Sequence, residues 1–338
     1  MVIFIWTFVL RICIKVEQGI LYYIQIGIDK MLDLYGERYI PIIDIKIDEV
    51  KNIFTEFDKT ISVSDFNAIQ VGCKNSNFIV CTNKRKFLLR ITNLTDFNNE
   101  IIAYELVKDK INIPNLLFHT TKHNMNIFIY QYINGVSLQK HIIGNNQCDY
   151  SLLEQIAKAS AIIHNTPKEK TVGLAEWDVP PYEVWYESFL DNPMVRARIG
   201  GELHERIQRL VFDKKEFISE IDGFKSFIHN DFRPANMLVN EYNQVYFVDW
   251  EGAWWGHSIA DIGTFFRFRP FFTITHVNLF EQVYNSFANK KLPDNWFELS
   301  LFRDLVNPLQ LLSSNQEAPL RNTVLFNIIE GILAYWDY

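Results

Sequence analysis

The chain lacks an excess of basic residues and any grouping of its cysteines. Lys and Arg number 33 against 40 Asp and Glu, a formal net charge of −7 at pH 7. An acidic surface disfavours nucleic acid and anionic membranes as partners, because both carry negative charge. The four cysteines, Cys13, Cys73, Cys81 and Cys148, show neither metal-ligand nor redox spacing. They fit reduced thiols in the cytoplasm.

Long apolar segments are also missing. Val2–Leu10 is a largely apolar run of nine residues, whereas roughly 20 are needed to span a bilayer. No small-residue cleavage site follows it, so a stable membrane span and a secretion signal are both disfavoured. Three interpretations of residues 1–30 stay open: an added helix or strand packed on the fold, a weak membrane-surface anchor, or sequence upstream of a start at Met31.

Length and apolar content are sufficient for two domains, or for two lobes around one cleft. The chain has 338 residues, of which 48% are hydrophobic and 27 are Phe, so a large core is expected. No internal repeat or low-complexity linker interrupts it. The patterns predict a helix within 44–59, strands at 66–71, 78–81, 87–92 and 127–130, and an amphipathic helix at 152–164.

The most informative segment is 226–251, SFIHNDFRPANMLVNEYNQVYFVDWE. It predicts a short strand, a polar loop, and a hairpin of two strands at 237–240 and 245–249. Such a hairpin brings Asn236 beside Asp249. Two oxygen ligands for a hard divalent cation and one spare carboxylate, Asp231, are what phosphoryl transfer from a nucleoside triphosphate requires. The alternative is a polar hairpin whose Asx residues cap turns.

The order His229-x-Asp231-x(4)-Asn236 followed by Asp249 resembles the catalytic loop and metal-binding segment of the kinase-like phosphotransferases. The segments HNDFRPAN and VDWEGAWWG are most similar to the corresponding sequences of the aminoglycoside phosphotransferase and choline kinase branch. This resemblance implies ATP or GTP as phosphate donor and one or two Mg²⁺ held by Asn236 and Asp249. Asp231 would be the catalytic residue, which accepts a proton or orients the substrate hydroxyl.

The resemblance also implies an α+β, two-lobed protein-kinase-like fold. A small antiparallel-sheet lobe that binds the nucleotide is expected over 31–133, and a larger, mainly helical lobe over 134–338. The residues implied to contact the nucleotide are Gly72, Ser76 and Asn77 in the covering loop, Arg90 on the α/β-phosphates, Glu100 as the partner of Arg90, and Gln131 and Ile133 in the hinge. A plain hairpin turn is the alternative for the loop, and a first-turn Glu that favours the helix dipole is the alternative for Glu100.

The spacing beyond Asp249 disfavours a protein kinase. Only eleven residues separate Asp249 from Asp261, which leaves no room for an activation segment. Asp261 resembles the acid that steadies the catalytic loop by accepting backbone N–H bonds. His164, at the end of its helix, is interpreted as a structural histidine.

A small-molecule acceptor is favoured instead. The aromatic, acidic insertion at 171–200 matches the place where small-molecule kinases build their acceptor site. Its carboxylates could bind the ammonium groups of a cationic hydroxyl compound, most of all an aminoglycoside-type antibiotic; they are Glu176, Asp178, Glu183, Glu187 and Asp191. A solvated acidic helix face is the alternative.

Three tryptophans support a second class of acceptor. Trp250, Trp254 and Trp255 could form an aromatic cage for a quaternary ammonium, as in choline or ethanolamine kinases. Sugar kinases and an inactive, kinase-fold binding module are further alternatives. The sequence does not identify the acceptor, does not choose between ATP and GTP, and does not separate a monomer from a homodimer.

Overall fold

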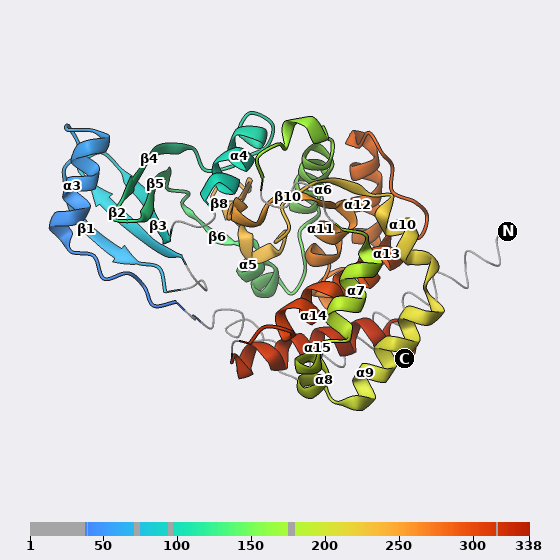
Figure 1. Ribbon diagram of the computed structural model, residues 1–338. Helices are drawn as coiled ribbons and strands as arrows, with labels where there is room; N and C mark the ends of the chain where they lie inside the picture. The colour runs from blue at the N-terminus through green and yellow to red at the C-terminus, as the bar shows by residue number, and fades with distance from the viewer. Residues whose placement is uncertain (1–37, 39, 71–74, 94–96, 175–179, 316) are drawn as a thin grey trace.

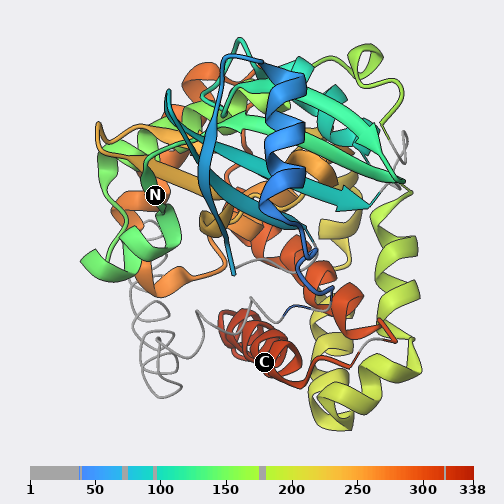
Figure 2. The ribbon, with the colours of Figure 1, turned by 90° about the vertical axis from the view of Figure 1, so that its left-hand side faces the viewer.

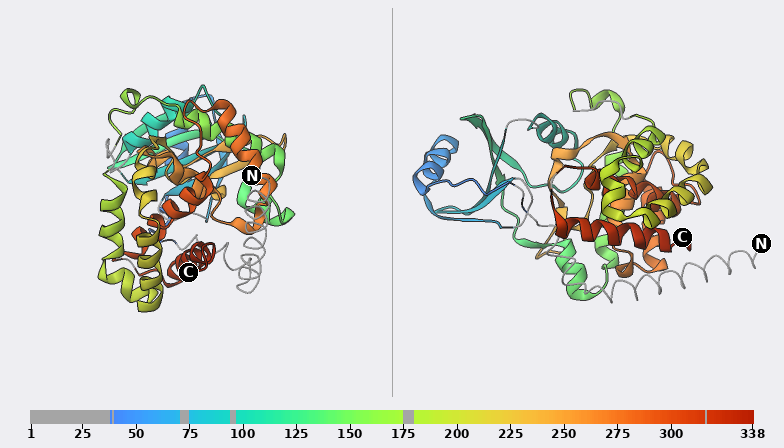
Figure 3. Two further views of the ribbon diagram at one scale, coloured as in Figure 1. Left: turned by 90° about the vertical axis from the view of Figure 1, so that its right-hand side faces the viewer. Right: turned by 60° about the horizontal axis from the view of Figure 1, so that its bottom comes forward.

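The computed structural model describes residues 38, 40–70, 75–93, 97–174, 180–315 and 317–338 (Figure 1). The expectations for residues 1–30, Gly72, Cys73, Glu176 and Asp178 lie outside these residues. The chain forms an α+β fold with two lobes, as expected. Figures 1 and 3 show a sheet lobe at one end of the molecule and a larger helical lobe at the other. No helix within the described ranges combines the length and apolarity that a membrane crossing needs.

The small lobe is a five-stranded antiparallel sheet in the order β1-β2-β3-β5-β4. Its strands are β1 (Val63–Ala68), β2 (Ser76–Thr82), β3 (Lys86–Asn93), β4 (Leu116–Lys122) and β5 (Met125–Gln131). The expected strands are present with shifted ends, and β4 is additional. Helix α3 (Ile47–Phe57) lies across one face of the sheet (Figure 2).

Alternation along β3 decides which side chains face α3. Phe87, Leu89 and Ile91 are buried in the cluster that also holds Phe54 of α3, and the rings of Phe54 and Phe87 pack edge to face at 5.5 Å. Because successive strand residues point to opposite faces, Arg90 points away from α3. It therefore faces α4 (Phe97–Val107) and the large lobe.

The large lobe is mainly helical. Its helices are α5 (Leu138–Asn145), α6 (Tyr150–His164), α7 (Tyr182–Leu190), α8 (Pro193–Ile199), α9 (Gly201–Asp213), α10 (Glu216–Asp222), α11 (Ser258–Phe265), α12 (Ile274–Phe287), α13 (Trp296–Asp304), α14 (Val306–Leu312) and α15 (Pro319–Ala334), with short 3₁₀ turns η3 (Lys168–Lys170), η4 (Pro234–Asn236), η5 (Trp250–Gly252) and η6 (Arg269–Phe271).

Helix α11 is the centre of this lobe. All of its residues are buried, and a Cβ at Gly263 would lie 2.3 Å from the backbone oxygen of Ser300 in α13. Glycine therefore permits a helix contact that any other residue would push apart. Phe265 and Phe266 continue this packing towards Phe280 and Trp296. The rigid position of α11 fixes Asp261, which lies on it.

Two small antiparallel sheets carry the motif segment. One consists of β6 (Gly135–Ser137), β8 (Met237–Asn240) and β9 (Val245–Phe247); the other pairs β7 (Lys225–Ile228) with β10 (Trp254–His257). The polar loop lies between β7 and η4, so both of its ends are held by regular structure.

Candidate active site

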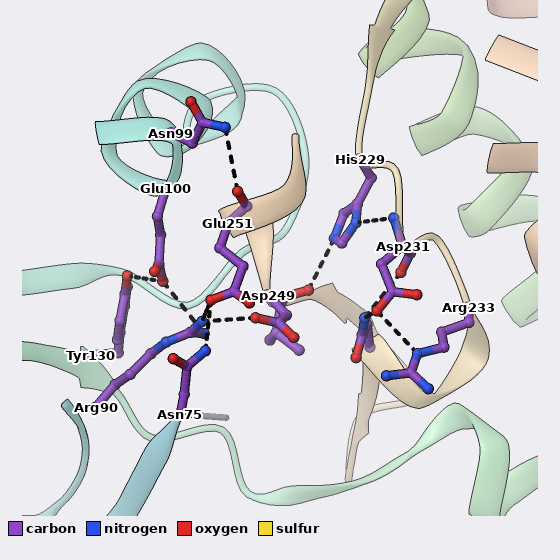
Figure 4. A network of polar contacts seen from close by, with 12 residues as sticks. Asn75, Arg90, Asn99, Glu100, Tyr130, His229, Asp231, Arg233, Asp249 and Glu251 are labelled. Atoms are coloured by element: carbon purple, nitrogen blue, oxygen red, sulfur yellow. Dashed lines mark hydrogen bonds and ion pairs between the residues drawn. The ribbon is translucent and has the colours of Figure 1, made fainter. Parts of the chain in front are cut away.

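Asp231 lies in the loop after β7 (Figure 4), and its side chain contacts Asn236, the last residue of η4. The Asn236 amide nitrogen donates to the backbone oxygen of Asp231 at 3.0 Å and to its Oδ2 at 2.7 Å. Arg233 Nε donates to the same Oδ2 at 3.1 Å. The side chain of Asp231 is still 42% exposed. The loop thus holds the carboxylate in place and leaves it accessible.

Asp261, on α11, holds the backbone of this loop. Its two carboxylate oxygens accept the backbone N–H groups of His229 and Asn230, both at 2.8 Å. This confirms the prediction made for Asp261. His164 Nε2 lies 3.4 Å from the same carboxylate, and its Nδ1 lies 2.9 Å from the Tyr284 hydroxyl. His164 is buried between these partners, as expected of a structural histidine.

His229 joins the loop to the segment that carries Asp249. Its Nδ1 accepts the backbone N–H of Asp231 at 3.3 Å, so the proton lies on Nε2, which donates to the Val248 oxygen at 3.0 Å. The Val248 N–H donates to the backbone oxygen of Asn236 at 3.0 Å. These bonds place Asn236 beside the Asp249 segment, as the hairpin predicts.

Asp249 itself departs from the predicted strand. Strand β9 ends at Phe247, and Asp249 has φ 71° and ψ 58°, in the left-handed region. Only a small fraction of residues other than glycine adopt this backbone, Asp and Asn most often among them. The prediction of a strand through Asp249 is therefore wrong at its end. The turned backbone directs the carboxylate towards Arg90 (Figure 4).

Arg90 is the hub of the site. Its Nη2 donates to Asp249 Oδ1 at 2.8 Å and to Glu251 Oε2 at 2.6 Å, and its Nη1 lies 3.5 Å from Glu100 Oε1. Arg90 and Glu100 are thus brought together as the resemblance implies. Within the described part of the chain, the buried Arg90 Nε has no hydrogen-bond partner. An unpaired buried guanidinium N–H is suited to an oxygen of an anionic ligand.

The charges at the hub shift one another's pKa values. Burial opposes ionisation of Arg90, but the carboxylates of Glu100, Asp249 and Glu251 hold its pKa well above the usual value. Burial would raise the pKa of Asp249, yet the Arg90 guanidinium outweighs it and the pKa is lowered. For Glu100 burial dominates, and its pKa is raised despite Arg90.

The sequence analysis missed four members of this network. Glu251 accepts from Asn75 Nδ2 at 2.6 Å as well as from Arg90, and its backbone oxygen accepts from Asn99 Nδ2 at 3.4 Å. Tyr130 donates its hydroxyl to Glu100 at 2.6 Å. The one available signal was the glutamate that follows Asp249 by two residues. Asn75, Asn99 and Tyr130 carry no local signal.

Two nucleotide-contact expectations require correction in their geometry. Ser76 was expected in a loop, but it begins strand β2, is buried, and accepts the Ile43 N–H on its Oγ at 2.9 Å. Asn77 also lies in β2, opposite Arg90 in the register. The side chain of Ser76 is buried because alternation along β2 directs it to the same face of the sheet as the buried Phe78.

The hinge is also more restricted than expected. The backbone N–H of Gln131 donates to the Asn115 oxygen at 2.9 Å, so it is not available to a purine. Ile133, two residues further on, is 9% exposed. A backbone N–H that binds a purine would therefore have to come from a residue after Gln131.

The three tryptophans do not form one cage. Trp250 is in the core, with its ring 4.4 Å from that of His229 and 6.2 Å from that of Phe227. Trp254 and Trp255 are successive residues of β10, so their side chains leave opposite faces. Trp254 stacks on Trp185 of α7 at 5.1 Å.

Comparison with known proteins places these features in a family. The model of the phosphotransferase enzyme family APH matches residues 65–291 of the 338. The "Protein LicA homolog" of Mycoplasma capricolum subsp. capricolum is 26% identical over 168 residues, which are 50% of this chain and 60% of that protein. The chain thus spans less than two thirds of the length of this relative.

Two solved structures show the same fold. The spectinomycin phosphotransferase APH(9)-Ia, in complex with ADP and spectinomycin, has a TM-score of 0.63 at 14% identity, over 88% of this chain and 100% of the other. The choline kinase LicA from Streptococcus pneumoniae has a TM-score of 0.58 at 15% identity, over 84% and 99%. The matched range 65–291 is more than half of the chain and contains Arg90, Asp231 and Asp249, and it shows that the chain belongs to the phosphotransferase enzyme family APH.

Proposed function

We propose that the protein transfers the γ-phosphate of ATP or GTP to a hydroxyl group of a small-molecule acceptor. The observation that carries this proposal is that three features lie together. They are the exposed Asp231 carboxylate, Asn236 bonded to the segment that carries Asp249, and Arg90 bonded to Asp249. Solved relatives contain ADP or AMP, which supports a nucleotide donor. The lobes over 31–133 and 134–338 would enclose it, with Asn77, which lies opposite Arg90 in the register of β2 and β3, near its phosphates.

Arg90 would bind the α/β-phosphates. Its buried Nε lacks a partner among the described residues, and its Nη2 is shared between Asp249 and Glu251 at 2.8 and 2.6 Å. Phosphate oxygens can therefore bind the guanidinium and take over part of this pairing. Glu100 would keep the side chain in place. In the hinge, the backbone around Ile133 would contact the purine.

The residues fit a hard divalent cation. Asn236 uses its amide nitrogen for Asp231, so its amide oxygen is the atom suited to ligation. The Asp249 carboxylate is ionised, because the Arg90 guanidinium outweighs burial and lowers its pKa. Oxygen ligands of this kind suit Mg²⁺. When bound, Mg²⁺ would neutralise charge that develops on the transferred phosphate.

Asp231 would accept the proton of the acceptor hydroxyl, or orient that hydroxyl towards the γ-phosphate. Asn236 and Arg233 fix its carboxylate at 2.7 and 3.1 Å, and Asp261 fixes the loop backbone. Such positioning, together with charge neutralisation, supplies most of the rate in phosphoryl transfer.

For the acceptor we favour a cationic compound of the aminoglycoside type, which would make the protein an antibiotic-resistance kinase. Three exposed acidic residues of the 171–200 insertion support it: Glu183 and Glu187 on α7, and Asp191 directly after it. A choline or ethanolamine acceptor is the second candidate. The similarity to a LicA homolog and to the LicA choline kinase supports it.

A coupled nucleotide-turnover assay tests the proposal. ATP and GTP are offered, with and without Mg²⁺, together with kanamycin-like, spectinomycin-like and macrolide antibiotics, choline, ethanolamine and sugars. We expect Mg²⁺-dependent turnover with one acceptor class and loss of turnover in Asp231→Asn. Nucleotide binding without turnover on any acceptor would contradict the proposal and favour a binding module.

A further inference from the structure

Tyr130 lies next to Arg90 on the same face of the sheet. In the register of β3 and β5, Leu88 pairs with Tyr130 and Arg90 pairs with Phe128. Tyr130 and Arg90 are therefore diagonal neighbours, and both project towards α4. Tyr130 is 8% exposed, and its hydroxyl donates to Glu100 Oε1 at 2.6 Å (Figure 4).

Among the described residues, the Tyr130 hydroxyl makes the shortest polar contact with the Glu100 side chain. Arg90 Nη1 lies 3.5 Å from the same Oε1 atom, whereas the Tyr130 oxygen lies at 2.6 Å. Glu100 is 5% exposed, so water offers little alternative pairing. The position of Oε1, and through it the contact with Arg90, therefore depends on Tyr130.

The geometry of Arg90 depends on more than one anchor. Its Nη2 is bound by Asp249, just before η5 of the large lobe, and by Glu251, in η5. Glu100 approaches Nη1 from α4 in the small lobe. Phosphate binding would draw the guanidinium away from Asp249. Glu100 is then the anchor that remains on the small lobe, and it must already be held in place.

We propose that Tyr130 is a positioning residue for nucleotide binding: its hydroxyl fixes the Glu100 carboxylate, which holds the Arg90 guanidinium where it meets the phosphates. This inference rests on the proposed nucleotide-dependent function. Burial raises the pKa of Glu100, and the hydrogen bond from Tyr130 opposes this change. Tyr130 thus also favours the charged form of Glu100 that Arg90 needs.

The test is the Kd of Mg·ADP, measured by calorimetry on the full chain at pH 7.5. Tyr130→Phe should raise it by about 5- to 10-fold, which lies within the net contribution of one typical intramolecular hydrogen bond. Tyr182→Phe is the matched control, because the buried Tyr182 hydroxyl also makes one hydrogen bond, to the Phe302 oxygen at 2.9 Å. It should lower the melting temperature and leave the Kd unchanged.

A double-mutant cycle separates positioning from general loosening. If Tyr130 acts through Glu100, Tyr130→Phe should change the Kd by less than twofold in a Glu100→Gln background. An unchanged Kd in Tyr130→Phe, fully additive effects, or an equal rise in Tyr182→Phe would overturn the inference while the wild type still binds Mg·ADP. A wild-type chain that does not bind Mg·ADP would overturn the proposed function itself, and the inference with it.

Discussion

Asp261→Asn should separate the anchoring of the catalytic loop from nucleotide binding. The wild-type carboxylate accepts two backbone N–H groups at 2.8 Å from a position that is 1% exposed. Hydrogen bonds to a charged group contribute about 1.5–3 kcal/mol each. Asparagine keeps one acceptor oxygen and turns an amide towards the other N–H, so one bond is lost and the other weakened. We expect the free energy of unfolding to fall by about 2–4 kcal/mol.

The variant should still fold, because domains have about 5–15 kcal/mol of stability. Its loop should move, since Asn230 has φ 68° and loses the bond that holds it there. A displacement of about 1 Å at reacting groups lowers turnover by about 10²-fold. The Kd for nucleotide should change little, because Arg90 and Asp249 have their own partners.

The matched control is Asp304→Asn. Asp304 is also 1% exposed and is bound by Arg267 at 2.6 and 2.9 Å, but it does not touch the loop. Chemical denaturation and steady-state turnover are measured on both variants. Comparable destabilisation with a fall in kcat in Asp261→Asn alone is expected. If Asp261→Asn kept wild-type kcat, or Asp304→Asn lost as much, the anchoring role of Asp261 would be refuted.

Two further predictions concern the metal site and acid stability. Asp249→Asn keeps a residue that tolerates its left-handed backbone but removes the negative charge, and should strongly weaken the Mg²⁺-dependent part of nucleotide affinity; calorimetry with unchanged Mg²⁺ dependence would count against ligation there. Burial, then Arg303 and Lys225, lower the pKa of His257 to about 2. Below pH 6.5 the unfolded chain therefore takes up a proton that the folded chain does not. The free energy of unfolding consequently decreases as the pH is lowered. The loss due to His257 is about 2 kcal/mol between pH 7 and pH 5. Urea unfolding at both pH values should show that His257→Gln loses about that much less than the wild type, and equal losses would show that His257 is not responsible.

Local spacing was sufficient to predict the catalytic loop. Asp231 and Asn236 are five residues apart in one turn of chain, so their contact at 2.7 Å follows from the loop itself. The Asp261 contact followed from its distance beyond Asp249 and from the resemblance to kinases. The Arg90–Glu100 pair also came from the resemblance, because 3.5 Å between two lone charged residues has no local signature.

Contacts between distant segments could not be predicted. Glu251 meets Asn75 across 176 positions of the chain, and only the packing of the small lobe against the large lobe brings them together. The cage of tryptophans failed because adjacent strand residues such as Trp254 and Trp255 diverge. Strand β4, LLFHTTK, was missed because its side chains are only partly buried and give no clear alternation.

The most direct test of the central claim is γ-phosphate transfer by Asp231→Asn, measured with the acceptor that the turnover assay identifies. The substitution keeps the size of the side chain and its contact with Asn236 while removing the negative charge. The account predicts that kcat falls by about 10²–10⁴-fold and that the Kd for Mg·ADP stays close to that of the wild type. Turnover at the wild-type rate would contradict it.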